Sequence, residues 1–328
     1  MFDITGGKVT INNVIFDGVK KGAVVRTVGT EFAMDNVTAQ NSEHTVGQGL
    51  FRLVGQNTIT NSKFLNNNCS MVITLNYDGE SNTPQLVKNC LFEGNECNSV
   101  AALYYVKGAG CTIKDSEFVE NTVNCNNNGA TVYLGFTENN VVTGNIFDSN
   151  NVIDASTSAR VAGAIFFGYE AEIENNVFVG NTASNANNDV LGQICTSTYY
   201  DCTIDLSGNY WGGEAPEYGK DYTIQHTAAE HQGVFQLDNY YKTFTTDENG
   251  NVELGDKVNI DYVAQVGKFS YETLAEAFTV AQENETITLL IDTELSEMIT
   301  IPNGKTVVLD LNGKIITGTD KGTASFGL

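Results

Sequence analysis

Carboxylates at recurring positions are the residues of this chain best suited to acid–base chemistry. Two carboxyl groups about 5 to 9.5 Å apart can hydrolyse a glycosidic bond. Asp17, Glu93 and Asp148 each follow a recurring aromatic residue by one position, and Glu120 follows such a residue by two. Carboxylates at one slot of neighbouring repeats would converge, but these positions flank an outward turn, where we expect solvated charges. We therefore assign no catalytic residue from the sequence.

Histidine and cysteine patterns do not indicate a metal site. Of the three histidines, His44 lies within the repeats, while His226 and His231 lie beyond them. The seven cysteines lack the CxxC spacing that zinc sites use. Cys69 and Cys97 both lie five residues after their repeat phenylalanine, so we expect them to stack on neighbouring coils as small buried thiols. An acidic surface can hold calcium, but no motif supports it, and we expect no cofactor.

Three aromatic residues are the better candidates for a binding surface. Tyr104, Tyr133 and Phe166 alternate with side chains that are expected to face a core, so these three should face outward. Stacked exposed rings can hold a glycan. The long loops after Asn121 and Asn150 offer another outcome, in which the loops fold over the rings and bury them.

A repeat of 23 to 33 residues must position all of these side chains. It contains an aromatic residue preceded by a hydrophobic residue and an asparagine, and followed by another asparagine, as in IENNVFVGN from Ile173. Successive copies are 23, 25, 28, 26, 29, 31 and 33 residues apart, with Ala39 in one degenerate copy. Self-similarity at this period indicates a solenoid. The expected ladder of aromatic residues is Phe16, Phe64, Phe92, Phe118, Phe147, Phe178 and Trp211.

Asparagines form two further columns. The first stands three residues before the aromatic residue, where tolerance of left-handed backbone geometry suits a tight bend. A bend is needed there because the apolar residue five positions before the phenylalanine would otherwise face the opposite side of a straight strand. The second column stands three residues after the aromatic residue, and stacked amides in it can bond along the column. This second column is Asn67, Asn95, Asn121, Asn150 and Asn181.

Another strand follows in each repeat, as in VITLNY from Val72 and AIFFGY from Ala164. Alternation predicts one inward column of Ile73, Val132 and Ile165. The next inward column is expected to contain Leu75, Leu103, Leu134 and Phe167. Two or three short strands per coil predict an all-β chain that folds as a parallel β-helix solenoid.

The end of the chain departs from the repeat. GNYWGG from Gly208 replaces the phenylalanine by a Tyr–Trp pair, and Trp211 is expected to cover the open end of the stack. We divide the chain into a parallel β-helix over 1–213, a cap and linker over 214–260, and a small α+β segment over 261–328 that begins a second β-helix-like module. Ser270 is expected to cap a short helix there. Strands are predicted at TITLLID, MITIPNG, KTVVLDLNG and KIITG.

Charge and hydropathy narrow the range of partners. The net charge of −23 argues against nucleic acid or an anionic membrane, because each phosphate contact needs Lys or Arg. No run approaches the roughly 18 apolar residues of a membrane span, and no signal peptide is visible. Because the first residues already lie within a repeat, we expect a piece of a longer protein, and we expect it to be a monomer.

The repeat over about residues 9 to 213, with GNYWGG as its last coil, resembles the right-handed parallel β-helix proteins of the pectin-lyase-like superfamily. More narrowly, it looks like repeat-rich, adhesin-like surface proteins of bacteria or archaea. The stretch from Tyr262 looks like an opening segment of bacterial cell-surface proteins.

This resemblance implies an extracellular, non-catalytic stalk or adhesin at the cell surface. Its partner would be a glycan or a surface protein of a host or another microbe. The alternative that the superfamily implies is a polysaccharide lyase or glycoside hydrolase. The NTD, DD, GHG and RxK motifs of its pectin-cleaving members do not occur in this sequence.

Overall fold

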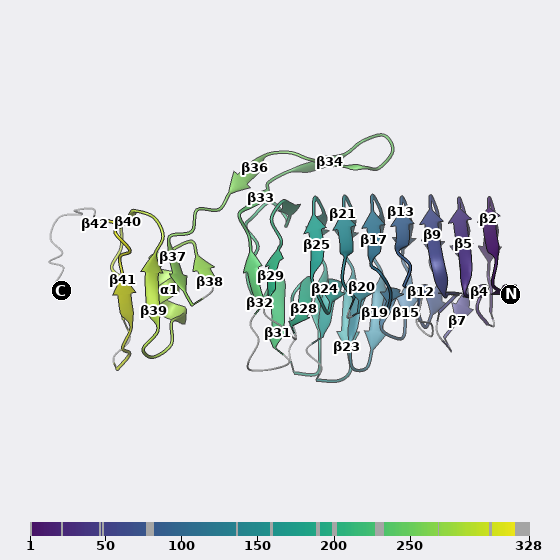
Figure 1. The fold of residues 1–328 in the computed structure, drawn as a ribbon, viewed down its shortest axis with the longest axis horizontal. Coiled ribbons are helices and arrows are strands. Elements are labelled where there is room, and N and C mark those ends of the chain that lie inside the picture. Colours follow the sequence, from purple (N-terminus) through teal and green to yellow (C-terminus); the bar gives the residue numbers. More distant parts are fainter. Residues whose placement is uncertain are drawn as a thin grey trace. The chain divides into compact units, whose positions relative to one another are not determined.

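A computed structural model describes the chain over residues 2–20, 22–45, 47, 49–76, 82–135, 137–157, 160–187, 191–198, 202–226, 233–267, 269–301 and 304–318. For residues 198, 202–203, 225–226 and 233–235 only the backbone is described. The chain divides into two compact units, Met1–Val258 and Asn259–Leu328 (Figure 1). Strands make up 52% of the chain and helix 2%. The predicted all-β class is confirmed.

The first unit is a right-handed parallel β-solenoid of about seven turns, which confirms the predicted β-helix. Its nine-stranded sheet consists of β1 (Phe2–Thr5), β4 (Val25–Val28), β8 (Phe51–Leu53), β12 (Ile73–Leu75), β16 (Ala101–Tyr105), β20 (Gly129–Leu134), β24 (Val161–Phe167), β28 (Ile194–Thr198) and β31 (Tyr222–His226). Its ten-stranded sheet consists of β3 (Ile15–Asp17), β6 (Thr38–Gln40), β10 (Lys63–Leu65), β14 (Leu91–Glu93), β18 (Glu117–Val119), β22 (Ile146–Asp148), β26 (Val177–Val179), β30 (Asn209–Tyr210), β33 (Asn239–Tyr241) and β36 (Lys257–Asn259).

Two further sheets complete the coils. The seven-stranded sheet consists of β2 (Lys8–Asn12), β5 (Thr30–Asp35), β9 (Gly55–Thr60), β13 (Gln85–Lys88), β17 (Cys111–Lys114), β21 (Asn140–Thr143) and β25 (Ala171–Glu174). The six-stranded sheet consists of β7 (Glu43–His44), β11 (Asn68–Cys69), β15 (Glu96–Cys97), β19 (Thr122–Cys125), β23 (Asn151–Asp154) and β27 (Thr182–Ser184). The parallel pair β29 (Cys202–Asp205) and β32 (Gly233–Gln236) and the antiparallel hairpin β34 (Phe244–Thr246) and β35 (Val252–Leu254) follow towards the end of the unit.

The corner between the seven-stranded and ten-stranded sheets lies at the first asparagine column, as predicted. Asn61 and Asn89 have φ angles of 51° and 59°, and Asp115, which replaces asparagine in its copy, has φ 50°. This left-handed backbone turns the chain sharply, so that Ile59 before the corner and Phe64 after it are both fully buried. The repeat therefore closes around one apolar core.

One inward column differs from the prediction. Leu103 pairs with Ile73 on one side and Val132 on the other, so it belongs to the first inward column. Tyr105 takes the place expected for Leu103 in the second column. The alternation of inward and outward residues predicts which face of the strand a side chain occupies. It does not fix the register between strands, because shifting a strand by two residues leaves every side chain on the same face. The assignment of Leu103 to the second column was therefore wrong.

The second unit contains α1 (Leu274–Val280), the sheet order β38 (Phe269–Tyr271), β37 (Ala264–Val266), β39 (Thr286–Leu289) and β41 (Val308–Asp310), and the pair β40 (Thr293–Leu295) and β42 (Ile316–Gly318). Its core is formed by Leu274 and Phe278 of the helix with Ile287 and Leu289 of β39.

Two details of the second unit correct the prediction. The helix is capped by Thr273 rather than Ser270, because Thr273 and Glu276 form a reciprocal capping box. The described residues of MITIPNG form no strand, and the preceding segment Thr293–Leu295 pairs with Ile316–Gly318 instead.

Candidate functional site

The recurring aromatic residues stack inside the solenoid. Neighbouring ring centroids lie 4.6 to 5.3 Å apart in the fully buried series Phe64, Phe92, Phe118, Phe147 and Phe178. Trp211 stacks on Phe178 at 4.7 Å and closes the series. Phe16 is half-buried and is separated from Phe64 by Ala39, so its ring meets Phe51 edge-on at 6.1 Å instead. These rings belong to the core and are not presented to a ligand.

The second asparagine column is a buried amide ladder. Side-chain Nδ2 donates to Oδ1 of the next coil at 2.8 to 2.9 Å along Asn67, Asn95, Asn121, Asn150 and Asn181. Each Nδ2 also donates to a main-chain carbonyl of the preceding coil, as from Asn121 to Phe92 at 2.8 Å. The ladder continues from Asn181 to Gln193 Oε1 at 3.0 Å and from Gln193 to Asp221 at 2.8 Å. Both amide donors are used, so the column is structural.

A third ladder was missed in the sequence. Asn145 donates to Asn176 Oδ1 at 3.0 Å, and Asn176 donates to Asn209 Oδ1 at 3.1 Å. These residues stand two positions before the aromatic residue, and Ser116 and Cys90 hold the same position in earlier coils. Serine and cysteine in the earlier copies conceal the column, because a repeat is recognised by identical residues.

The proposed aromatic platform is covered. Tyr133 and Phe166 are buried, with ring centroids 4.4 Å apart, and Tyr104 is half-buried. All residues of β20 and β24 are buried, so both faces of these strands are packed. The expectation that the rings are exposed is therefore wrong for Tyr133 and Phe166. These two rings are buried, which is the alternative that the sequence also allowed. The three rings join an outer apolar cluster with Cys195.

The carboxylates named from the sequence do not converge. Asp17, Glu93 and Asp148 share one column of the ten-stranded sheet, but Gln40, Leu65 and Val119 lie between them. With about 4.8 Å between strands, Glu93 and Asp148 are about 10 Å apart and Asp17 is further away. Glu120 lies at a corner with φ 52° and is exposed.

Another carboxylate on the same sheet has an altered environment. Burial raises the pKa of Glu117, the nearby charge of Glu93 raises it further, and Lys63 opposes this change. A β-carbon built on Gly250 would lie 3.2 Å from Glu117 Oε1, so the tip of the β34–β35 hairpin lies against this carboxylate. At its base the hairpin packs Phe244 against Tyr210, with ring centroids 4.9 Å apart.

Cysteine and histidine side chains have structural positions. Cys69 pairs with Cys97 on the next coil as expected, and both are buried thiols outside any disulfide. A hydrogen bond with Cys97, followed by burial, raises the pKa of Cys69. His44 pairs with Cys69 on the other side, and burial lowers its pKa. His231 and the side chains of His226 and Cys202 lie outside the described residues.

Over the described ranges, no group of three or more His, Cys, Asp or Glu side chains is arranged to hold a metal ion. Within the same ranges, no helix has the length and apolar character that crossing a membrane requires.

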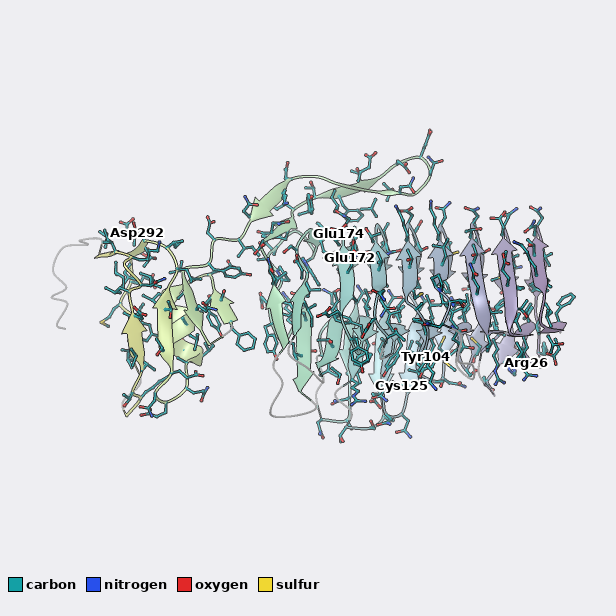
Figure 2. All side chains as sticks on the ribbon, viewed as in Figure 1. Arg26, Tyr104, Cys125, Glu172, Glu174 and Asp292 are labelled. Atoms are coloured by element: carbon teal, nitrogen blue, oxygen red, sulfur yellow. The ribbon has the colours of Figure 1, made fainter. Side chains whose placement is uncertain are left out.

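A groove of about 860 Å³ lies on the outer side of the seven-stranded sheet, over β21 and β25. Figure 2 shows Glu172 and Glu174 on β25. Asn139 and Asp205 also line the groove, and Tyr241 and Lys257 contribute from later strands. We call this feature the β25 groove. It crosses consecutive coils, and most of its polar lining comes from acids and amides.

The outward carboxylates of the β25 groove suit a polar ligand. Glu172 and Glu174 both face outward because Ile173 between them is buried, and two residues of strand separate their Cα atoms by about 7 Å. Separate hydroxyl groups of a ligand can donate to the two carboxylates.

Sequence repeats could not identify the β25 groove. The residues that pair with Glu172 and Glu174 on the preceding coil are Val141 and Thr143, so the pair of acids does not continue into that coil. No protein-family model matches the chain, and no curated protein or solved structure matches it in the corresponding searches.

Proposed function

We propose that this chain is a non-catalytic part of an extracellular surface protein of the pectin-lyase-like β-helix type, a stalk or adhesin that binds a glycan. The β25 groove is the observation that carries this proposal. It is open, crosses successive coils and is lined by carboxylates, an amide and Tyr241. Carboxylates and amides bond sugar hydroxyls, and a tyrosine ring supplies an apolar face for a sugar ring.

The negative charge of the β25 groove determines which glycans it can bind. Glu170, Glu172, Glu174 and Asp205 outnumber Lys257, the single basic residue of the lining. A uronic-acid polymer would bring like charges next to these carboxylates, which costs free energy. The proposed ligand is therefore a glycan without carboxylate groups. The same repulsion weighs against a lyase that acts on uronic-acid polymers.

The rigid ladders support the stalk part of the proposal. Buried amide and aromatic columns fix each coil against its neighbours, so a groove that crosses coils keeps its shape without ligand. A preorganised groove loses little conformational entropy on binding. Protein partners on a host or microbial surface would be reached through the glycans that they carry.

A glycan array tests the proposal. The intact chain should bind uncharged or amino-bearing glycans and should not bind uronic-acid polymers. The paired change Glu172→Gln with Glu174→Gln should remove binding, whereas Glu96→Gln, an exposed carboxylate on the six-stranded sheet, should leave it intact. Preferred binding of uronic-acid polymers, or binding unaffected by the paired change, would contradict the assignment of the groove.

The alternative is a glycoside hydrolase, and one observation favours it. Glu172 and Glu174 are two outward carboxylates on one strand and line one groove, and a glycosidase needs such a pair as its acid and its base or nucleophile. Reducing sugar released from an uncharged glycan by the intact chain, and abolished by either single glutamine substitution, would establish hydrolysis. Such a result would replace the non-catalytic assignment.

A further inference from the structure

A second cavity lies at the corner between the nine-stranded and seven-stranded sheets. It has a volume of about 530 Å³ and is lined by segments that connect these two sheets. The segments come from four successive coils, whose strands β13, β17, β21 and β25 lie side by side in Figure 1. Each of these coils contributes one of the side chains Asn82, Lys107, Glu138 and Tyr169. We call this feature the corner pocket.

The corner pocket and the β25 groove share a boundary. Asn139 lines both of them. Glu170, which lines the groove, directly follows Tyr169, which lines the pocket. Asn139 and Glu170 are both exposed, so the boundary between the two cavities is open to solvent. The two cavities therefore meet at the surface of the first unit.

Together the two cavities form a long path. They cross six successive coils, from Asn82 before β13 to Tyr241 on β33. Coils stack about 4.8 Å apart, so the path extends about 24 Å in the stacking direction. One sugar of an extended glycan is about as long as one coil spacing. The path therefore holds several consecutive sugars, and a disaccharide fills only part of it.

The polar groups of the corner pocket differ from those of the groove. Most charged side chains of the groove are carboxylates, which accept hydrogen bonds from ligand hydroxyls. The corner pocket has one charge of each sign, on the exposed side chains of Lys107 and Glu138. The Lys107 ammonium group has three donors, so it can bond the hydroxyl and ring oxygens of a sugar. The half-buried ring of Tyr169 supplies an apolar surface for the same sugar.

We propose that the corner pocket is a second sugar subsite, and that the ligand of the β25 groove is an oligosaccharide long enough to reach from Tyr241 to Lys107. Tyr169 and Lys107 hold one sugar in the pocket, and the groove holds the sugars that follow it. Once the groove has bound one end of the glycan, the pocket binds the other end as an intramolecular step. This inference rests on the proposed function and deepens it, because it states the length of the glycan.

Calorimetric titration of the intact chain with oligosaccharides of increasing length tests the proposal. The probes are β-linked glucose, α-linked mannose and β-linked N-acetylglucosamine oligosaccharides, each from the dimer to the octamer. In the series that binds, affinity should rise at least about tenfold from dimer to octamer. Tyr169→Ala and Lys107→Gln should each weaken octamer binding at least about fivefold and leave dimer binding unchanged.

Controls separate the second subsite from the groove. Tyr218→Ala removes a 59% exposed ring that lines neither cavity, so it should change neither affinity. Affinity that does not depend on glycan length, or octamer binding unaffected by both pocket substitutions, would overturn the second subsite and leave the proposed function standing. No binding at any length in all three series, or dimer binding unaffected by Glu172→Gln with Glu174→Gln, would contradict the proposed function and this inference with it.

Discussion

Asn121 Nδ2 donates to Asn150 Oδ1 on the next coil at 2.9 Å, and the same oxygen accepts the main-chain N–H of Asn121 at 3.0 Å. One amide thus fixes both the side chain and the backbone of its neighbour. The contact recurs at Asn67, Asn95 and Asn150, each towards the following coil. The stacking of coils depends on this column as well as on apolar burial.

Removing one amide from the column should destabilise the first unit strongly. Asn121→Ala takes away the amide that donates to the Phe92 carbonyl and the oxygen that accepts from Asn95 Nδ2 and from the Asn95 main-chain N–H, so three buried groups each lose a hydrogen bond. At about 1 kcal/mol or more for each buried unsatisfied group, unfolding free energy should fall by at least about 3 kcal/mol. Urea unfolding measures this. Asn124→Ala, at an exposed position of β19, should change it by less than about 0.5 kcal/mol, and equal losses would contradict the ladder.

The corner asparagines should tolerate glycine better than alanine. Asn89 has φ 59° and donates to Asn61 Oδ1 at 2.8 Å. Both substitutions remove this hydrogen bond, but only alanine carries a β-carbon into the left-handed conformation. The Asn89→Ala chain should therefore be about 1–2 kcal/mol less stable than the Asn89→Gly chain. An alanine variant at least as stable as the glycine variant would show that the corner conformation carries no such cost.

The stacked rings should carry a large share of stability. Phe118 is fully buried, with ring centroids 4.7 Å from Phe92 and 4.9 Å from Phe147. Phe118→Ala should lower unfolding free energy by about 3–5 kcal/mol, because the transfer free energy is lost and a cavity remains. Phe2→Ala, at an exposed ring of the first coil, is the matched control and should cost much less. A small loss at Phe118 would mean that neighbouring coils collapse into the cavity.

Stability should depend on pH through Glu117. Its pKa in the folded chain is raised above the ordinary value of 4.5, so the folded state binds more protons than the unfolded state once the pH exceeds that value. Stability should then fall as pH rises from about 4.5 towards the raised pKa. Glu117→Gln should flatten this part of the pH profile and stabilise the chain at pH 7. Urea unfolding of both chains between about pH 4 and 8 measures this, and an equally steep profile in the Glu117→Gln chain would contradict the assignment.

Much of the fold was predictable because stacked coils repeat their residues. A phenylalanine such as Phe118 and an asparagine such as Asn121 recur at the same position of each coil, so their burial and stacking follow from the pattern. The ladder through Asn176 was missed because Cys90 and Ser116 occupy the same slot in earlier coils. A slot filled by different residues gives no periodic signal.

The candidate site could not be predicted for a related reason. Alternation placed Tyr133 and Phe166 on the outer face, but it does not reveal that this face is itself covered. Glu172 and Glu174 replace Val141 and Thr143 of the preceding coil, so they break the pattern. Side chains that serve a ligand need to match the ligand and have no reason to recur in every coil.

The most direct test of the proposed function is calorimetric titration with an uncharged glycan identified on the array. The intact chain should bind it, and changing Glu172 and Glu174 together to glutamine should weaken binding at least about tenfold. Glu96→Gln should retain the original affinity. Affinity unchanged by the paired substitution would contradict the assignment of ligand binding to the β25 groove.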